Sequence, residues 1–192
     1  MKLIADCGST KIDWCVIENG KVVKQIFTCG MNAIMLTEEE MAERIKNELR
    51  SEVEGYQIDE VYFYGAGCIS DEVCGNVRRA IAQSIPAGVI EVHTDLLAAA
   101  RALCGREPGI ACILGTGSNS CFYNGKIIVR NVRPGGYILG DEGSGAVLGK
   151  LFLSDVLKNL SPAGVTSDFF DKFRTCIGLI LLSLFSSSFL SP

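Results

Sequence analysis

The sequence contains one structural plan twice, and this repeat constrains the fold more than any other feature. Residues 3–23 (LIADCGSTKIDWCVIENGKVV) suggest a strand, a Gly-Ser-Thr turn, a second strand and an Asn-Gly hairpin into a third strand. Residues 111–129 (ACILGTGSNSCFYNGKIIV) follow the same order. Asn-Gly between two strand-like runs is a strong hairpin signal. A chance match of two hairpins is the alternative, but the shared turn before each one favours duplication of a single α/β unit.

The first copy continues with alternating helices and strands. Thr37 and Glu40 have the spacing of a capping box, and apolar residues recur every four positions after them, so we predict an amphipathic helix at 38–54. The other expected strands are 2–6, 12–18, 21–28, 58–67 and 88–93, and the other expected helices are 70–84 and 95–104. This order, β-β-β-α-β-α-β-α, is typical of an α/β domain.

The repeat also divides the chain. We predict an N-terminal domain at 1–108 and a partial second domain at 109–174, with a helix at about 144–160. The segment 175–192 contains no charged residue and is rich in Ser and Leu. A membrane span needs about 20 mostly apolar residues, and serines interrupt this segment. Too few residues follow the start of the second copy for it to be complete. We therefore expect the segment to reflect truncation or a shifted reading frame.

Composition limits the classes of function. The formal net charge is −4 and the apolar content is 48%, so we expect a globular core and no binding of nucleic acid. The nine cysteines include no C-x-x-C pair, and a single histidine leaves few ligands for zinc. With an odd number of cysteines and no signal peptide, we expect free thiols in the cytoplasm, all nine of them buried and structural.

Two turns have the composition of phosphate-binding loops. In DCGSTK (6–11), Asp6 ends a strand and the turn brings backbone N–H groups near a phosphate, while the carboxylate is suited to Mg²⁺. LGTGSNS (114–120) is the equivalent turn of the second copy, and we expect the two turns to face each other across a cleft around a polyphosphate. Ordinary hairpin turns with capping side chains are the alternative for each.

Asp95 follows a predicted strand directly, at the sheet edge where open α/β sheets bind ligands. A base at this position orients a hydroxyl for attack on phosphorus, and the alternative is a helix N-cap formed by Thr94 or Asp95. His93 has no predicted partner and is assigned to the core or its rim. The glycine-rich stretch 135–150 (GGYILGDEGSGAVLGK) is not a Walker A loop, because Ser144 and Leu151 occupy two of its fixed positions.

These motifs together resemble a known family. The order DCGSTK, Gly30-Met31-Asn32, Thr94-Asp95, GTGSN and GGYILGDEGSG is similar to that of the N-acetylglucosamine kinase and BadF/BadG/BcrA/BcrD ATPase family, within the sugar kinase/Hsp-chaperone/actin superfamily. The resemblance covers roughly residues 2–170. It implies duplicated ribonuclease-H-like (actin-like ATPase) domains of the α/β class, the second one incomplete.

The resemblance also implies roles for individual residues. Asp95 would be the catalytic base, and Asp6 would help to hold Mg²⁺. The ATP phosphates would contact both turns through Gly8, Ser9, Thr10, Lys11, Gly115 and Thr116. The acceptor would contact Asn32, Gly117, Asn119 and Asp141.

The implied activity is ATP-dependent phosphorylation of an amino-sugar hydroxyl, with a small-molecule sugar as partner, no membrane partner and a homodimer as a possible assembly. Ser9 replaces a glycine common in the family, and Ala33-Ile34 follows Asn32 where animal kinases have an aromatic residue. The family's adenosine-binding elements lie in the part of the second domain that this sequence lacks, which would impair activity. The alternatives are an ATPase that activates a dehydratase, which expects Gly-Gly-Gln-Asp at the second turn, and a non-catalytic sugar- or nucleotide-binding module.

Overall fold

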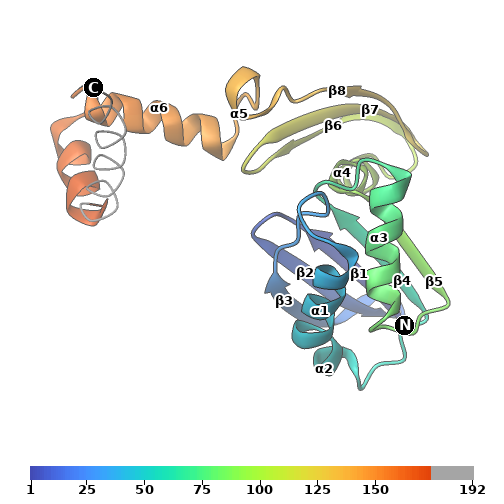
Figure 1. The fold of residues 1–192 in the computed structure, drawn as a ribbon. Coiled ribbons are helices and arrows are strands. Elements are labelled where there is room, and N and C mark those ends of the chain that lie inside the picture. The colour runs from blue at the N-terminus through green and yellow to red at the C-terminus, as the bar shows by residue number, and fades with distance from the viewer. Residues whose placement is uncertain (174–192) are drawn as a thin grey trace, which may run out of the picture. The chain divides into compact units, whose positions relative to one another are not determined.

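The computed structural model describes residues 1–173, which form two compact units (Figure 1). Unit 1 comprises residues 1–113 and 119–133, and unit 2 comprises residues 114–118 and the chain from Pro134 onward. The predicted tail 175–192 lies outside the described residues. The domain boundary predicted at 108/109 follows the sequence repeat rather than compactness, and it stays a prediction.

Unit 1 is built on a five-stranded sheet in the order β3-β2-β1-β4-β5. β2 runs antiparallel to both β1 and β3, whereas β4 is parallel to β1 and β5 is parallel to β4. The strands are β1 (Lys2–Cys7), β2 (Lys11–Glu18), β3 (Lys21–Cys29), β4 (Glu60–Gly65) and β5 (Val89–Thr94). The predicted order of strands and helices in the first copy is confirmed.

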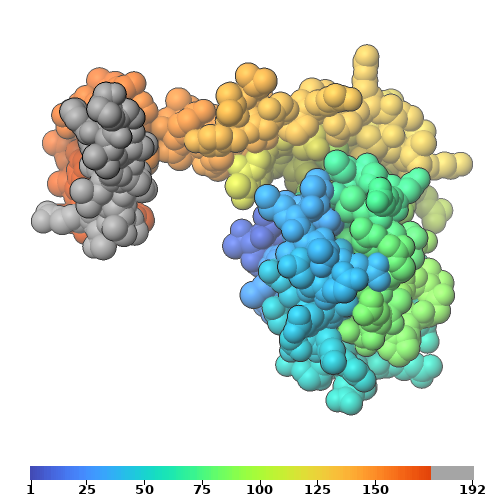
Figure 2. Space-filling view, in the orientation of Figure 1, coloured from blue at the N-terminus to red at the C-terminus, as the bar shows by residue number. Residues whose placement is uncertain are grey.

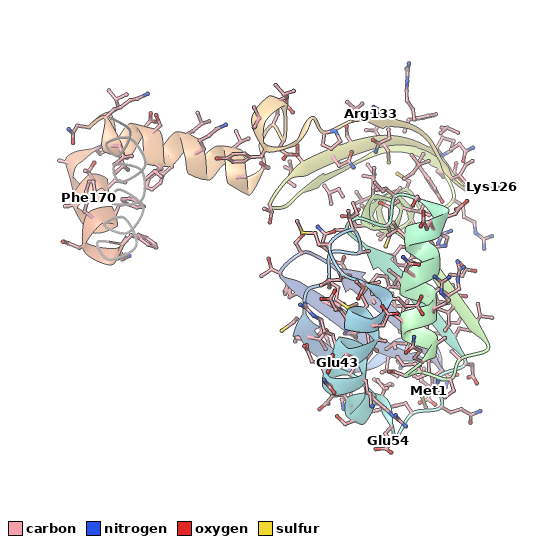
Figure 3. All side chains as sticks on the ribbon, viewed as in Figure 1. Met1, Glu43, Glu54, Lys126, Arg133 and Phe170 are labelled. Carbon is pink, nitrogen blue, oxygen red and sulfur yellow. The ribbon has the colours of Figure 1, made fainter. Side chains whose placement is uncertain are left out.

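Helices α1 (Glu38–Glu48) and α3 (Asp71–Ala82) cover one face of this sheet (Figure 1). Their buried side chains form one core with alternate residues of the strands, among them Leu3, Trp14 and Phe63. Figure 2 shows these elements, coloured blue to green, as one continuous body. Glu43, labelled in Figure 3, lies on the exposed side of α1, as the amphipathic pattern requires.

The prediction of one continuous helix at 38–54 is wrong. The Thr37–Glu40 capping box is present, but α1 ends at Glu48 and a separate short helix, α2, spans Arg50–Val53. Leu49 has a φ of −112°, far from the helical value of about −63°, so the backbone turns there. Leu49 and Val53 are both buried, so the four-residue apolar spacing continues across the break between α1 and α2. The spacing alone therefore does not reveal the break.

Helix α4 (Asp95–Cys104) links the first sheet to a second, three-stranded sheet in the order β6-β7-β8. Leu96, Leu97 and Ala100 of α4 form a smaller core with Ala111, Cys121 and Tyr123. The strands are β6 (Pro108–Leu114), β7 (Ser118–Asn124) and β8 (Ile128–Val132), and β7 pairs antiparallel with β8. The second copy thus repeats the strand–turn–strand–hairpin–strand plan of the first.

Unit 2 contains the short helix α5 (Gly136–Leu139), helix α6 (Gly145–Leu157) and helical residues at 163–173. α6 begins after Ser144, which is fully buried and whose hydroxyl accepts a hydrogen bond from Val147 N. The predicted helix at 144–160 is therefore present but shorter. No helix within residues 1–173 is long and apolar enough to cross a membrane.

The cysteines differ in exposure. Cys7, Cys68 and Cys121 are buried, but Cys29 and Cys112 are exposed, so the expectation of nine buried thiols is wrong. Cys29 ends the edge strand β3, and Cys112 lies on the face of β6 opposite to the one that packs on α4. Cys176 lies outside the described residues.

Candidate active site

Two carboxylates lie at the same edge of the first sheet. β1, β4 and β5 run parallel, and Cys7, Gly65 and Thr94 are aligned at their carboxyl ends. Asp6 is the last residue but one of β1, and Asp95 directly follows β5. With one strand between them, the two backbones are about 10 Å apart. Unit 1 thus brings together the two acidic residues predicted for metal binding and catalysis.

Asp6 has the environment of a cation ligand. Burial, together with the negative charges of Asp95 and Asp13, raises its pKa, and the positive charge of Lys11 acts in the opposite direction. Its carboxylate has no hydrogen-bond partner among residues 1–173. Repulsion from like charges favours binding of a cation at this position.

A single free carboxylate is better suited to Mg²⁺, whose other ligands are water and phosphate, than to a metal ion that is held by several protein side chains. Within the described part of the chain, no three or more His, Cys, Asp or Glu side chains form a cluster that would hold a metal ion. Mg²⁺ at phosphate sites is usually held by one or two carboxylates, with water and substrate phosphates completing its shell. Asp6 therefore fits the predicted ion.

The first turn, residues 8–11, is closed by its own backbone and supported from below. Gly8 N donates to Lys11 O at 3.0 Å, and Gly30 N donates to Thr10 O at 3.0 Å. A Cβ at Gly30 would lie 2.5 Å from backbone atoms of Ser9 and Thr10. Gly30 is thus required for this contact, a role that the sequence analysis missed although the residue belongs to the motif.

The tip of the first turn presents unused donors. Ser9 and Thr10 are exposed, and neither backbone N–H has a protein acceptor within residues 1–173. Successive free N–H groups in a tight turn form an anion-binding concavity. The turn therefore presents two backbone donors of the kind that bind anions.

Asp95 uses one of its two carboxylate oxygens at the start of α4. Its Oδ1 accepts hydrogen bonds from Leu96 N at 2.8 Å and Thr94 Oγ1 at 3.0 Å, and the Thr94 hydroxyl caps α4 by accepting a longer bond from Leu96 N. No hydrogen bond engages Asp95 Oδ2 in the described residues. One oxygen fixes the side chain, and the other remains available to a ligand.

Asn32 lies in a loop that touches the segment after β4. Its Oδ1 accepts from Ile34 N at 3.1 Å, and a Cβ on Gly67 would lie 2.8 Å from that oxygen. Gly67 has a φ of +83°, a conformation that L side chains rarely adopt. The carbonyl oxygen of Asn32 is thus engaged in the loop, and its Nδ2 is left as a donor.

The second turn, residues 115–117, is held differently. Gly115 N donates to Gly117 O at 2.8 Å, and the first residues of α6 bind the turn, through Gly145 N to Gly115 O at 2.8 Å and Ala146 N to Thr116 O at 3.2 Å. Thr116 N has no acceptor among the described residues. The turn is therefore attached to the start of a helix within unit 2.

Asp141 supports the second turn with its side chain. It is 9% exposed, and its Oδ1 accepts from Ser118 N at 3.1 Å. Its φ is +61°, in the left-handed region, where Asp is tolerated better than most residues. A Cβ at Gly117 would lie 2.9 Å from Asp141 Oδ1, so Gly117 allows this approach.

Asn119, in unit 1, uses its carbonyl oxygen internally. Its Oδ1 accepts from Ser120 N at 2.8 Å and from Asn131 Nδ2 at 3.0 Å. Its Nδ2 has no acceptor in the described residues. As for Asn32, any contact with a ligand is expected through the amide nitrogen.

His93 is partly buried, as expected for the rim of the core, and the structure gives it a partner that the sequence did not predict. Its Nε2 lies 3.1 Å from Glu91 Oε2, and its ring centre lies 5.8 Å from that of Tyr64. Arg101 of α4 donates to the Tyr64 hydroxyl at 2.8 Å. The strand alternation offered a signal for the first pair, since residues 91 and 93 share a face, but none for Arg101.

Comparison with known proteins gives one informative relative. No protein-family model matches the chain, and no curated protein sequence matches it. Among solved structures, a Porphyromonas gingivalis protein that is provisionally assigned as an N-acetylglucosamine kinase is 44% identical, with a TM-score of 0.89. The alignment covers 98% of this chain and 68% of that one.

More distant structures share the fold. A Chromobacterium violaceum protein with the same provisional assignment is 20% identical, with a TM-score of 0.66 and coverage of 88% and 62%. The ethanolamine utilization protein EutJ of Carboxydothermus hydrogenoformans is 16% identical, with a TM-score of 0.57 and coverage of 98% and 72%. The α/β architecture is thus the duplicated ribonuclease-H-like arrangement of actin-like ATPases, with the second domain represented in part, and the chain belongs to the N-acetylglucosamine kinase family.

Proposed function

We propose that this protein takes part in ATP-dependent phosphorylation of a sugar hydroxyl, with an amino sugar such as N-acetylglucosamine as the acceptor. The observation that carries the proposal is the placement of Asp6 and Asp95 at one carboxyl edge, beside a turn with free backbone N–H groups. The 44% identity to a provisionally assigned N-acetylglucosamine kinase supports the same chemistry.

Asp95 is the proposed general base. The acceptor hydroxyl donates a hydrogen bond to Oδ2, which no protein group occupies in the described residues, and its oxygen attacks the terminal phosphorus of ATP. The bond from that phosphorus to the ADP oxygen breaks, and the hydroxyl proton passes to Asp95. Phosphoryl transfer depends mainly on positioning and on neutralising charge, so a weak base suffices.

The phosphates of ATP are proposed to bind the two turns. Ser9 and Thr10 contribute backbone N–H groups beside Gly8, Lys11 contributes its ammonium, and Gly115 and Thr116 form the second contact. Asp6 is the proposed ligand of Mg²⁺, which when bound neutralises negative charge on the phosphates.

The acceptor is proposed to contact groups that the protein leaves unused. Asn32 and Asn119 each have an Nδ2 without an acceptor in residues 1–173, which can donate to a sugar oxygen. Asp141 keeps Oδ2 for a sugar hydroxyl while Oδ1 holds Ser118 N. Gly117 leaves room for that carboxylate. The set of amide donors and a carboxylate acceptor suits a polyhydroxylated amide.

The length of the chain bears on its affinity for ATP. The alignment covers 68% of the relative's length. We propose that the part of the relative outside the alignment holds adenosine-binding elements, so ATP binds this 192-residue chain weakly.

We also propose that the protein is located in the cytoplasm, because its nine cysteines show no spacing typical of a disulfide framework.

A coupled assay of N-acetylglucosamine with ATP tests the proposal. Asp95→Asn is expected to lower kcat by at least about 100-fold, as loss of a general base usually does, while sugar binding is retained. Asp71→Asn is the matched control, since Asp71 is likewise the first residue of a helix after a hydroxyl N-cap. An unchanged kcat in Asp95→Asn would contradict the kinase assignment. Sugar binding without turnover in a version of this protein extended to the relative's full length would also contradict it.

A further inference from the structure

An exposed aromatic side chain lies beside the proposed phosphate-binding lysine. Lys11 begins β2, and strand pairing places it opposite Cys29 and places Asp13 opposite Phe27. Lys11 and Phe27 are thus diagonal neighbours on one face, within reach of long side chains. The Lys11 ammonium lies 5.3 Å from the centre of the Phe27 ring, inside the usual range of a cation–π contact. Phe27 is 60% exposed, so core packing does not account for it.

One carboxylate beside Lys11 on β2 is engaged elsewhere. Asp13 lies two residues along β2 on the same face, but both of its oxygens accept hydrogen bonds from Gln25 Nε2, at 2.9 and 2.7 Å. Within residues 1–173, Lys11 forms no ion pair with Asp13 or another carboxylate. Gln25 thus satisfies Asp13 and leaves the lysine free.

The kind of contact matters for binding. A salt bridge would occupy N–H donors of the ammonium and neutralise its charge, whereas the face of a ring attracts the charge without neutralising it. The positive charge of Lys11 also acts on Asp6, where it opposes the rise in the pKa of that carboxyl group. The ammonium therefore lies near the candidate metal ligand, and its charge is not paired with a carboxylate within residues 1–173.

We propose that Phe27 and Gln25 are positioning residues for the phosphate-binding lysine: Phe27 holds the Lys11 ammonium, and Gln25 prevents Asp13 from capturing it. The ligand is the polyphosphate of a nucleoside triphosphate. This inference rests on the role given to Lys11 under the proposed function.

Substitution of Phe27 tests the first half. In titration calorimetry of the full 192-residue chain with inorganic tripolyphosphate, Phe27→Leu is expected to weaken binding about two- to fivefold, the range of an exposed cation–π contact. Phe27→Tyr keeps the ring and should retain affinity. Phe122→Leu, which removes an exposed ring from β7, is the matched control and should have no effect. Equal affinities for Phe27→Leu and wild type would overturn this half.

A double substitution tests the second half. Gln25→Leu frees Asp13 to pair with Lys11 and should weaken tripolyphosphate binding by up to about fivefold, the range of an exposed ion pair. Adding Asp13→Asn removes the competitor and should restore affinity to the wild-type value. Asp13→Asn alone measures the gain from removing a negative charge near the phosphate, and a rescue no larger than that gain would overturn this half.

Lys11→Met separates this inference from the proposed function. If Lys11→Met leaves tripolyphosphate affinity unchanged, the phosphate-binding role of Lys11 is wrong. If it weakens binding while Phe27→Leu and Gln25→Leu do not, the role of Lys11 stands and the positioning inference is wrong. Where turnover is measurable, Phe27→Leu should raise KM for ATP and leave kcat unchanged, the signature of lost uniform binding.

Discussion

The two turns of the repeat have the same plan but different supports. The turn at 8–11 rests on the backbone of Gly30, a residue with no side chain to offer a ligand. The turn at 115–117 is bound by the first residues of α6 and adjoins Ser118, which the Asp141 carboxylate holds. In the first copy, support and ligand binding belong to different residues. In the second, the proposed role of Asp141 combines them, so a substitution there affects both.

The strands that carry the turns also differ. β1 lies inside its sheet, between β2 and β4, whereas β6 is an edge strand of the three-stranded sheet among the described residues. The position before the last strand residue is Asp6 in the first copy and the apolar Ile113 in the second. The first copy therefore carries the candidate metal ligand on an inner strand, whereas the second copy has an apolar residue on an edge strand.

The largest effect is expected from Gly30→Ala. The added Cβ would lie 2.5 Å from backbone atoms of the first turn, so the turn must move. We expect a loss of about 3 kcal/mol in the free energy of unfolding and at least about tenfold weaker binding of ATP. Urea denaturation followed by fluorescence of Trp14, the single tryptophan, reports on this core. Gly55→Ala, where a Cβ meets nothing within 4 Å, is the control, and equal losses in the two variants would refute the supporting role of Gly30.

A smaller effect, divided between two functions, is expected at Asp141. Asp141→Ala leaves Ser118 N without its acceptor, which costs about 1–3 kcal/mol. Asp141→Asn keeps an acceptor oxygen and tolerates the positive φ. Hydrogen exchange at the Ser118 amide should therefore accelerate in the alanine variant and stay slow in the asparagine variant. Sugar affinity should fall in both, and exchange in the alanine variant that is as slow as in wild type would show that the carboxylate does not support the turn.

The smallest effect concerns pH and Asp6. Burial and the charges of Asp95 and Asp13 raise the pKa of Asp6 in the folded state, so folding favours its protonated form. That contribution is fully present below the unfolded pKa of about 3.9 and is lost as pH rises through the higher folded pKa. Asp6→Asn should therefore be more stable than wild type at pH 7, and the difference should shrink as the pH falls toward about 4.

Urea denaturation at a series of pH values measures this difference. Glu18→Gln, an exposed carboxyl at the end of β2, serves as the control. A difference for Asp6→Asn that grows on acidification would contradict the direction of the pKa shift. The second copy has no matching effect to test, because Ile113 does not titrate.

The sequence predicts the elements of the first copy well where local signals are strong. The capping box at Thr37 and Glu40 and the Asn-Gly hairpin correctly mark the start of α1 and the β2–β3 turn. The break at Leu49 escapes prediction because the apolar spacing is the same on both sides of it. Tertiary packing decides this backbone turn, and periodicity does not record it.

The candidate site was predictable to a similar extent. Motif spacing places Asp6 and Asp95 at strand ends, and parallel pairing then aligns them. The contacts that tune the site are long-range, such as Gly30 under Thr10 or Arg101 on Tyr64, and no local pattern encodes them. The Gln25–Asp13 bond is intermediate, because the hairpin register predicts diagonal neighbours but not which of them bond.

An NMR titration of the 192-residue chain with Mg²⁺ and ATP tests the phosphate-binding role of the turns most directly. The amide signals of Ser9 and Thr10 are expected to shift with ligand, together with that of Thr116, and Gly30→Ala should abolish the shifts at Ser9 and Thr10. Saturation with ATP that shifts signals elsewhere and leaves those of Ser9 and Thr10 unchanged would contradict the proposed site.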